Sequence, residues 1–278
     1  MILKQSATIK EQSNVNYING IVQFSSVRLN VCAFETDGVL IDTGSASIFR
    51  EFKPFLDRAD VDKVVITHHH EDHTGGARYL QDTRQLPIFM NEKLIDDMKK
   101  RASYPIYRKM FWGVRKPFEA KPIGEKFESR TATWKVIETP GHAIDHVSFI
   151  NEQTGQLFSG DLYVHPETKL LLRNESIPQI IDSIERLLTY DFDEMFCCHA
   201  GYVKDGRKAL QNKLTYLTDL CDRVLDYANQ GYTEKEIHKI IFPNTYPIVY
   251  FSFGDWNSKH IIHSILRDHE KFASIALK

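Results

Sequence analysis

The chain has 278 residues, of which 42% are hydrophobic and 26% are charged, and its formal net charge is −2 at pH 7. This composition is typical of a globular protein large enough for one domain with an extension. Near-neutrality excludes a strong electrostatic bias toward nucleic acid or membranes. No apolar run has the length of a membrane span or signal-peptide core, and the four cysteines form no disulfide-like pattern. We therefore expect a cytoplasmic protein without membrane contact.

The first half of the chain alternates strand-like and helix-like segments. Residues 15–24 and 27–34 are rich in β-branched and aromatic side chains, which favour strands, and 39–41 is a short apolar run of the same kind. Over 48–56 the apolar side chains recur at helical spacing. The same reasoning predicts a strand over 61–67, a helix over 76–81, a strand over 87–90 and a helix over 92–101.

The second half continues this alternation and then changes character. Ser176 begins a capping pattern, and the isoleucines and leucines of 177–188 lie on one face of the helix that follows. From about residue 206 the apolar spacing is helical throughout. We therefore predict an α/β domain over 1–205 and a C-terminal helical extension over 206–278. The strands predicted in this half cover 133–139, 146–150, 156–161 and 194–198.

The densest cluster of ionisable side chains runs from His68 to His73, directly after the strand-like residues 64–67. In an extended segment the side chains at i and i+2 point the same way, so His68 and His70 converge while His69 points away. Two glycines then let the backbone turn tightly into a helix. Neutral imidazoles and carboxylates are the ligands that zinc and iron take in proteins. The cluster therefore predicts a metal site at the end of a strand.

Three later strands also end in residues that bind metals. His142 follows the predicted strand 133–139, Asp161 closes the strand 156–161, and His199 follows the strand 194–198. Because α/β proteins build their sites at the carboxyl ends of strands, we expect these side chains to join the His68–His73 cluster. Asp42 also stands at a strand end, where it either orients another group or stabilises a turn.

This pattern resembles the metallo-β-lactamase-fold hydrolase superfamily, and its extension is similar to that of the β-lactamase-like-2 hydrolases of the glyoxalase II-like branch. The resemblance covers residues 15–205 and is specific for the fold and the metal site rather than the substrate. It implies an αββα sandwich, in which two mixed sheets face each other with helices outside. The matching pieces are Asp42-Thr43-Gly44, the His-x-His-x-Asp-His run from His68, Gly141-His142, Gly160-Asp161 and His199-Ala200-Gly201.

The resemblance also assigns the ligands residue by residue. One metal is held by His68, His70 and His142, and a second metal is held by Asp72, His73 and His199. Asp161 is expected to bridge the two metals, and Asp42 to hold a ligand imidazole in the correct tautomer. Two zinc ions are the expected cofactors, with iron or manganese as alternatives.

Such a site implies hydrolysis. A metal lowers the pKa of bound water from near 16 to about 7, and a metal-bound hydroxide can attack a carbonyl. We expect a dinuclear metal-dependent hydrolase acting on an ester, thioester or lactone, with the carboxylates of Asp72 and Asp161 at the reacting centre. A phosphodiesterase or nuclease and a non-haem iron oxidoreductase, such as a persulfide dioxygenase, are the alternatives. A non-catalytic binding protein is disfavoured because it would not need a complete ligand set.

Residues 99–126 differ from the rest of the chain in charge. They hold nine Lys or Arg against two Glu, a local charge of +7, which leaves −9 for the remainder of a chain of net charge −2. Five aromatic residues are interleaved with these charges. The segment is either a lid that receives an anionic, partly apolar small-molecule substrate, or a loop that packs its aromatics and solvates its charges. Nucleic acid is the less favoured partner, and a homodimer is left open.

Overall fold

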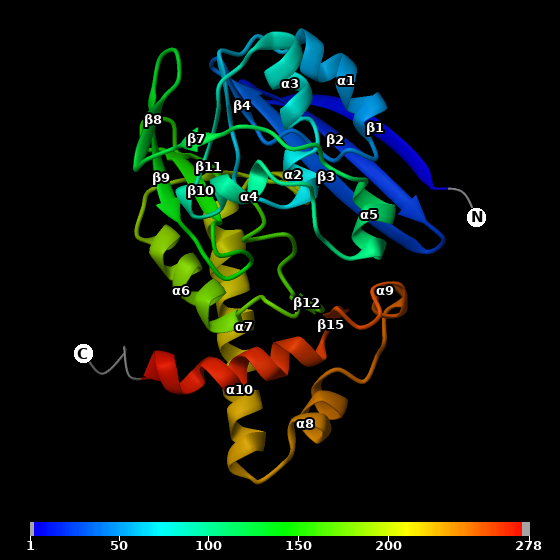
Figure 1. The fold of residues 1–278 in the computed structure, drawn as a ribbon. Coiled ribbons are helices and arrows are strands. Elements are labelled where there is room, and N and C mark those ends of the chain that lie inside the picture. The colour runs from blue at the N-terminus through cyan, green and yellow to red at the C-terminus, as the bar shows by residue number, and fades with distance from the viewer. Residues whose placement is uncertain (1–2, 274–278) are drawn as a thin grey trace.

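Two β-sheets pack face to face, with helices on both outer sides, in a computed structural model that describes residues 3–273 (Figure 1). The first sheet has the strand order β1 to β7; β1 to β4 are antiparallel, and β4 to β7 are parallel neighbours. The strands are β1 (Lys4–Gln12), β2 (Val15–Phe24), β3 (Val27–Thr36), β4 (Val39–Ile41), β5 (Lys63–Val65), β6 (Ile88–Met90) and β7 (Lys121–Pro122).

The second sheet has the order β14-β13-β11-β10-β9-β8, and its strands are antiparallel except for the parallel pair β11 and β13. Parallel neighbours in both sheets are joined by helical crossovers, as an α/β architecture requires. These strands are β8 (Lys126–Glu128), β9 (Thr133–Glu138), β10 (Val147–Asn151), β11 (Gln156–Phe158), β13 (Glu194–Cys197) and β14 (Gly201–Val203).

Helices cover the outer face of each sheet, which confirms the predicted αββα architecture. The first sheet is covered by α1 (Phe49–Arg58), α3 (Ala77–Arg84) and α5 (Ile106–Trp112), and the second by α6 (Ile177–Leu188) and α7 (Gly206–Asn229) (Figure 1). Amphipathic spacing explains this placement, because the apolar side of each helix meets the apolar side of a sheet. Short helical turns at α2 (Glu71–Thr74), η1 (Glu92–Leu94) and α4 (Ile95–Met98) lie in the connections.

The layer between the sheets is aromatic. Phe34 of the first sheet contacts Phe158 and Phe196 of the second, with ring centroids 5.4 and 5.7 Å apart, and those two rings stack at 5.0 Å. All three side chains are at most 1% exposed. Burying one such side chain contributes about 1.5–3 kcal/mol. This layer holds the strand ends that carry the candidate ligands in fixed relative positions.

The C-terminal extension consists of α7, α8 (Glu234–Ile241), α9 (Pro247–Phe251) and α10 (Lys259–Ala273), and residues 274–278 of the predicted extension lie outside the described residues. The predicted helical extension is confirmed, with one addition. A two-residue strand, β15 (Trp256–Asn257), pairs with β12 (Leu171–Leu172) and so ties the extension to the loop after Asp161. The two strands are too short for sequence patterning to reveal.

The sequence analysis also missed β1. This strand pairs with β2 along its whole length, from Lys4 opposite Gln23 to Gln12 opposite Val15. Seven of its nine residues are exposed and polar residues predominate, so its sequence lacks the alternation of a half-buried strand. None of the described helices is long and apolar enough to cross a membrane.

Candidate metal centre

The segment from His68 to His73 follows β5 and leads into α2. Its backbone is fixed by hydrogen bonds from Thr43 N–H to His73 C=O at 2.8 Å and from Gly75 N–H to Gly44 C=O at 2.8 Å. Gly75 packs so closely on a neighbouring loop that a Cβ would lie 2.3 Å from the nitrogen of Ala46. Glycine is therefore required here for close backbone approach, in addition to its role in the turn.

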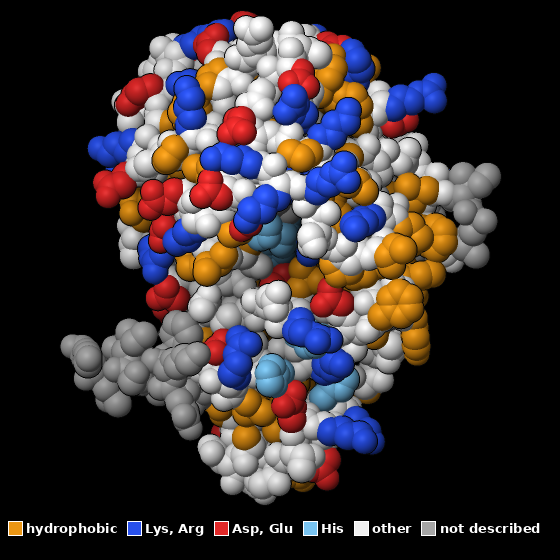
Figure 2. Space-filling model, in the orientation of Figure 1, with side chains coloured by type: hydrophobic (Ala, Val, Ile, Leu, Met, Phe, Trp, Pro, Cys, Tyr) orange, Lys and Arg blue, Asp and Glu red, His pale blue; other side chains and the backbone are white. Residues whose placement is uncertain are grey.

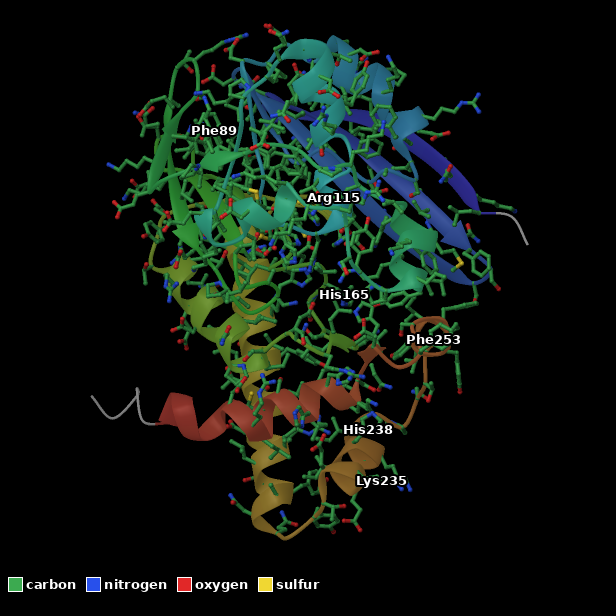
Figure 3. The ribbon with its side chains drawn as sticks, in the orientation of Figure 1. Phe89, Arg115, His165, Lys235, His238 and Phe253 are labelled. Carbon is green, nitrogen blue, oxygen red and sulfur yellow. The ribbon has the colours of Figure 1, made fainter. Side chains whose placement is uncertain are left out.

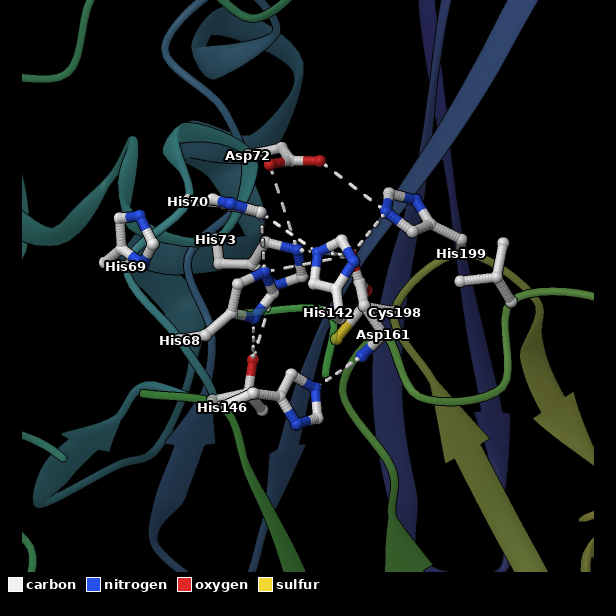
Figure 4. Close-up of polar contacts among 12 residues, drawn as sticks. His68, His69, His70, Asp72, His73, His142, His146, Asp161, Cys198 and His199 are labelled. Atoms are coloured by element: carbon white, nitrogen blue, oxygen red, sulfur yellow. Dashed lines mark hydrogen bonds and ion pairs between the residues drawn. The ribbon is translucent and has the colours of Figure 1, made fainter. Parts of the chain in front are cut away.

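Three imidazole nitrogens converge at the end of β5 (Figure 4). His70 Nδ1 lies 3.0 Å from Nε2 of His68 and 3.0 Å from Nε2 of His142. Burial, reinforced by neighbouring cationic groups, holds the pKa of His68 and of His70 well below the ordinary value. Both rings are therefore neutral, which is the state that binds a metal.

A second group lies beside the first. Nε2 of His199 is 3.6 Å from Asp72 Oδ2, and Nε2 of His73 is 3.9 Å from Asp72 Oδ1. Asp161 lies between the two groups. Its Oδ2 is 2.9 Å from Nε2 of His199 and 3.3 Å from Nε2 of both His73 and His142. The structure thus brings all seven sequence-predicted ligands together. They form two trios, one of His68, His70 and His142 and one of Asp72, His73 and His199, and Oδ2 of Asp161 faces both.

The donor set fits divalent metals. Ligands about 2.0–2.1 Å from a tetrahedral zinc are roughly 3.3 Å from one another, close to the nitrogen separations at His70. Nε2 of His73 and Oδ1 of Asp161 are buried and have no hydrogen-bond partner in the described part of the chain. Buried polar atoms are rarely left unpaired without a functional reason. A bound cation would satisfy Nε2 of His73, which faces Oδ2 of Asp161 at 3.3 Å.

Three of the imidazoles have a polar partner at Nδ1, on the side of the ring that faces away from the centre. His73 Nδ1 is 2.8 Å from Asp42 Oδ2, and His142 Nδ1 is 2.6 Å from Glu175 Oε1. His199 Nδ1 donates to the carbonyl oxygen of Asn30. These contacts place the proton on Nδ1 and leave Nε2 free to face the site. The orienting role expected of Asp42 matches this geometry, whereas Glu175 was not identified from the sequence.

Asp42, His73 and Cys198 also lie close enough together to suggest a metal site, but their chemistry argues against one. The carboxylate of Asp42 accepts hydrogen bonds from the backbone and hydroxyl of Thr67, both at 2.8 Å, and from the thiol of Cys198 at 3.0 Å, besides the imidazole. Its lone pairs are therefore occupied by donors. This group supports the centre and does not itself hold a metal.

His146 is a second residue that sequence analysis did not single out. It is 1% exposed, its Nε2 accepts the backbone N–H of Asp161 at 3.0 Å, and its Nδ1 pairs with Thr139 Oγ1 at 2.8 Å. Burial lowers the pKa of His146 to about 4, so the ring is neutral and able to accept that bond. His146 thus fixes the backbone that presents Asp161. His69 turns away to Asp145, at 2.7 Å, in agreement with its exclusion as a ligand.

The candidate centre forms one end of a pocket of about 460 Å³. Figure 2 shows histidine side chains at the bottom of a hollow on this face, with Lys and Arg side chains above it. Apolar groups dominate the walls, and the C-terminal extension contributes two of the lining residues, Lys213 and Trp256. The apolar wall residues include Leu29, Trp112, Leu162, Leu170, Leu171 and Ile180.

The basic segment 99–126 is mostly structural. Tyr107, Phe111, Trp112 and Phe118 are buried. Arg115 is 6% exposed and donates to backbone carbonyls, including that of Met98 at 3.0 Å. The segment therefore packs its aromatics on the body, as one of the two interpretations predicted, although three of its side chains, at positions 107, 108 and 112, also reach the pocket.

Arg108 is the basic member of that group, and it already has a partner. Its Nε and Nη2 donate to the two carboxylate oxygens of Glu71 at 2.6 and 2.9 Å, and the Glu71 side chain is 2% exposed. Burial would lower the pKa of Arg108, but Glu71 raises it above the ordinary value, so the guanidinium stays charged. This ion pair ties α5 to α2, between the candidate ligands His70 and Asp72.

Comparison with known families and proteins gives a consistent result. The model of a family described as the Metallo-beta-lactamase superfamily matches residues 31–199. A beta-lactamase-like protein 2 homolog of Drosophila melanogaster is 22% identical over 219 residues, covering 74% of this chain and 71% of that protein. A metallo-beta-lactamase family protein from Thermus thermophilus superposes with a TM-score of 0.63 at 18% identity, covering 96% of this chain and 94% of that one.

Two further relatives have names that describe an activity. A hydroxyacylglutathione hydrolase of Hahella chejuensis is 26% identical over 140 residues, or 49% of this chain. The thioesterase pkgB of Emericella nidulans is 28% identical over 156 residues, or 53% of this chain. The alignments cover 47% and 38% of these two proteins, so this chain matches less than half of each.

Proposed function

Because the chain belongs to the Metallo-beta-lactamase superfamily, we propose that it is a dinuclear metal-dependent hydrolase that cleaves thioesters. The observation that carries this proposal is the position of Asp161. Its Oδ2 faces His73, His142 and His199 within 3.3 Å, so one carboxylate reaches both trios of ligands. We assign one metal to His68, His70 and His142, the second to Asp72, His73 and His199, and the bridge to Asp161.

Two divalent metals, when bound, supply Lewis acidity toward a carbonyl and a nucleophilic hydroxide at neutral pH. The chain's own groups fix the geometry of this chemistry. Glu175 and Asp42 hold the Nδ1 protons of His142 and His73, so each ring presents Nε2 to the centre. The carboxylate of Asp72 lines the pocket, where it is placed to accept a proton during the reaction.

The pocket supports a thioester or ester better than a phosphodiester. Its walls are mainly apolar and suit an acyl group, with Trp112 tilted beside His199 at a ring-centroid distance of 6.4 Å. The charge of Arg108 is already offset by Glu71. Arg28 is an exposed lining residue able to meet an anionic leaving group, whereas Lys169, another exposed lining residue, pairs with Glu167 at 3.5 Å. Both relatives with named activities are consistent with thioester hydrolysis.

The non-haem iron oxidoreductase remains the second candidate, because three histidines and carboxylates also suit iron. The decisive experiment combines metal analysis with a substrate panel. The purified protein is analysed by mass spectrometry for metals and assayed with an acyl-glutathione, an acyl-coenzyme A, a lactone and a bis(nitrophenyl) phosphate. We expect two zinc ions per chain, thioester hydrolysis as the fastest reaction, and loss of activity with a chelator. One iron per chain with oxygen uptake, or faster phosphodiester cleavage, would overturn the proposal.

A further inference from the structure

The loop that follows Asp161 contains a strained turn. Val164 has a backbone φ of 52°, in the left-handed region that β-branched residues avoid. The N–H of His165 donates to the carbonyl of Tyr163 at 2.6 Å, which closes a three-residue turn around Val164. A turn of this kind with a positive central φ is the rare and strained form of the γ-turn. Such strain persists only where surrounding structure holds it.

Lys213 of α7 supplies that support. Its Nζ donates to the carbonyl of Tyr163 at 2.6 Å and to the carbonyl of His165 at 3.0 Å, so it grips the backbone on both sides of Val164. The hydroxyl of Thr168, at 3.3 Å, accepts the third bond. An ammonium group has three donors, and these three partners use them all. Lys213 is therefore not available to hold an anionic substrate.

Lys213, which clamps the turn at Val164, is buried. Lys213 is 4% exposed, and its Nζ contacts two backbone carbonyls and one hydroxyl among the described residues. Burial lowers the pKa of Lys213 to about 8, as expected for an ammonium group removed from water. A buried lysine with only backbone and hydroxyl partners is unusual, because buried charges are normally paired.

The strained turn lies where a substrate would touch it. Val164 and His165 line the pocket, and the side chain of Val164 is 41% exposed. Figure 3 shows His165 between the sandwich and the C-terminal extension, near the centre of the molecule. A second contact holds the same loop, since the backbone N–H of Val164 donates to the Sγ of Cys197 at 3.3 Å. The turn thus connects the strand end that carries Asp161 to α7.

We propose that Lys213 is a positioning residue, which holds the strained turn at Val164 so that this turn forms a fixed wall of the substrate pocket. The C-terminal extension is then part of the active site, although it contributes none of the candidate ligands. The kinetic part of this inference rests on the proposed thioester hydrolysis.

The test compares Lys213→Met with Lys208→Met, which removes an exposed lysine from the same helix. For Lys213→Met we expect a KM about tenfold higher, a kcat within about threefold of wild type and unchanged metal content, the pattern of lost ground-state binding. Hydrogen exchange at the His165 amide should accelerate, because the turn opens more often. Lys208→Met should match wild type in every measurement.

The double variant Lys213→Met/Val164→Gly tests whether Lys213 is needed because the backbone at Val164 is strained. Glycine adopts positive φ without steric cost, so the turn should hold without the clamp. We expect the KM of the double variant to return to within about threefold of Val164→Gly alone. If Lys213→Met does not fold, the double variant should fold. Wild-type KM and exchange in Lys213→Met, or no rescue by glycine, would overturn the inference.

The same measurements separate this inference from the proposed function. If the wild-type protein hydrolyses no thioester, the proposed function fails. The exchange rate of the His165 amide still tests the clamp in that case.

Discussion

Oε1 of Glu175 lies 2.6 Å from Nδ1 of His142, while Nε2 of the same imidazole lies 3.3 Å from Oδ2 of Asp161. The ring is therefore held between a carboxylate behind it and the candidate centre in front. Burial alone would lower the pKa of His142, but Glu175 raises it. Glu175 is itself 6% exposed, and it directly precedes Ser176, the N-cap residue of α6.

From this contact we expect Glu175→Gln to weaken metal binding by about 10–100-fold, the usual effect of removing an outer carboxylate partner. Glu175→Ala should be at least as severe, because the ring also loses its steric support. The measurement is a competition titration with a chromogenic chelator. Glu185→Gln, an exposed residue on α6, is the control. Equal affinity in Glu175→Gln and the control would contradict the assignment.

Asp161→Ala should lose one of the two metals and most of the hydrolytic activity. Its carboxylate faces both trios, so without it the two cations would lack this shared anion. Circular dichroism should be unchanged, because the residue lies beyond the end of β11 and outside the aromatic layer. A variant with two metals per chain and full activity would show that Asp161 does not bridge.

Replacing Asp42 by Asn should reduce activity and stability less than replacing it by Ala. An asparagine side chain at this position would keep one acceptor for Thr67 and the same length, and asparagine tolerates the φ of 59° found here. We expect Asp42→Asn to reduce activity about 10–100-fold by weakening its hold on His73. Asp42→Ala should also lower Tm, because it leaves several buried donors unpaired. Wild-type activity in both variants would argue that the contact to His73 is only structural.

Arg108→Met should destabilise the protein by about 3–5 kcal/mol, because it leaves the buried carboxylate of Glu71 without a cationic partner. The double variant Arg108→Met/Glu71→Met should recover much of that loss, since both charges are then removed. Thermal unfolding monitors both effects, and Lys116→Met, an exposed change in the same segment, is the control. Equal Tm values for the single and double variants would contradict the unpaired Glu71 carboxylate as the cause of the lost stability.

The same double variant tests whether substrates are anionic. A direct role for Arg108 in binding predicts a raised KM for a charged acyl thioester and an unchanged KM for a neutral analogue, and the difference should shrink with added salt. Equal effects on both substrates would leave Arg108 with its structural role alone.

Arg130 leads to a prediction about pH. Its guanidinium donates four hydrogen bonds to Asp60 and Asp62 and holds the pKa of both carboxyls below the ordinary value. A carboxyl whose pKa is lower in the folded state stabilises the fold above its unfolded pKa of about 4, and this contribution disappears as the pH falls through the folded value. Arg130→Gln should therefore lower Tm at pH 7, and this difference should shrink as the pH falls below about 4. A Tm difference that does not depend on pH would exclude this linkage.

Sequence patterns alone predict the alternation of strands and helices, and they indicate which residues gather at the centre. These features are local. A strand shows its period over five residues, and the spacing of His68, His70 and His73 survives any arrangement of the rest of the chain. The strand-end positions of His142, Asp161 and His199 could be predicted because α/β folds bring such ends to one edge.

Contacts between distant parts of the chain, by contrast, establish which side chains support that centre. Glu175, His146 and Lys213 reach their partners across the fold, and nothing in their neighbouring sequence marks them. The ion pair of Arg108 with Glu71 joins residues 37 apart, and the clamp of Lys213 on Tyr163 joins residues 50 apart. A charge pattern shows that a segment is basic, but its electrostatic role depends on which carboxylates and carbonyls folding brings within hydrogen-bond distance, because that distance decides whether a charge binds a ligand or holds the protein together.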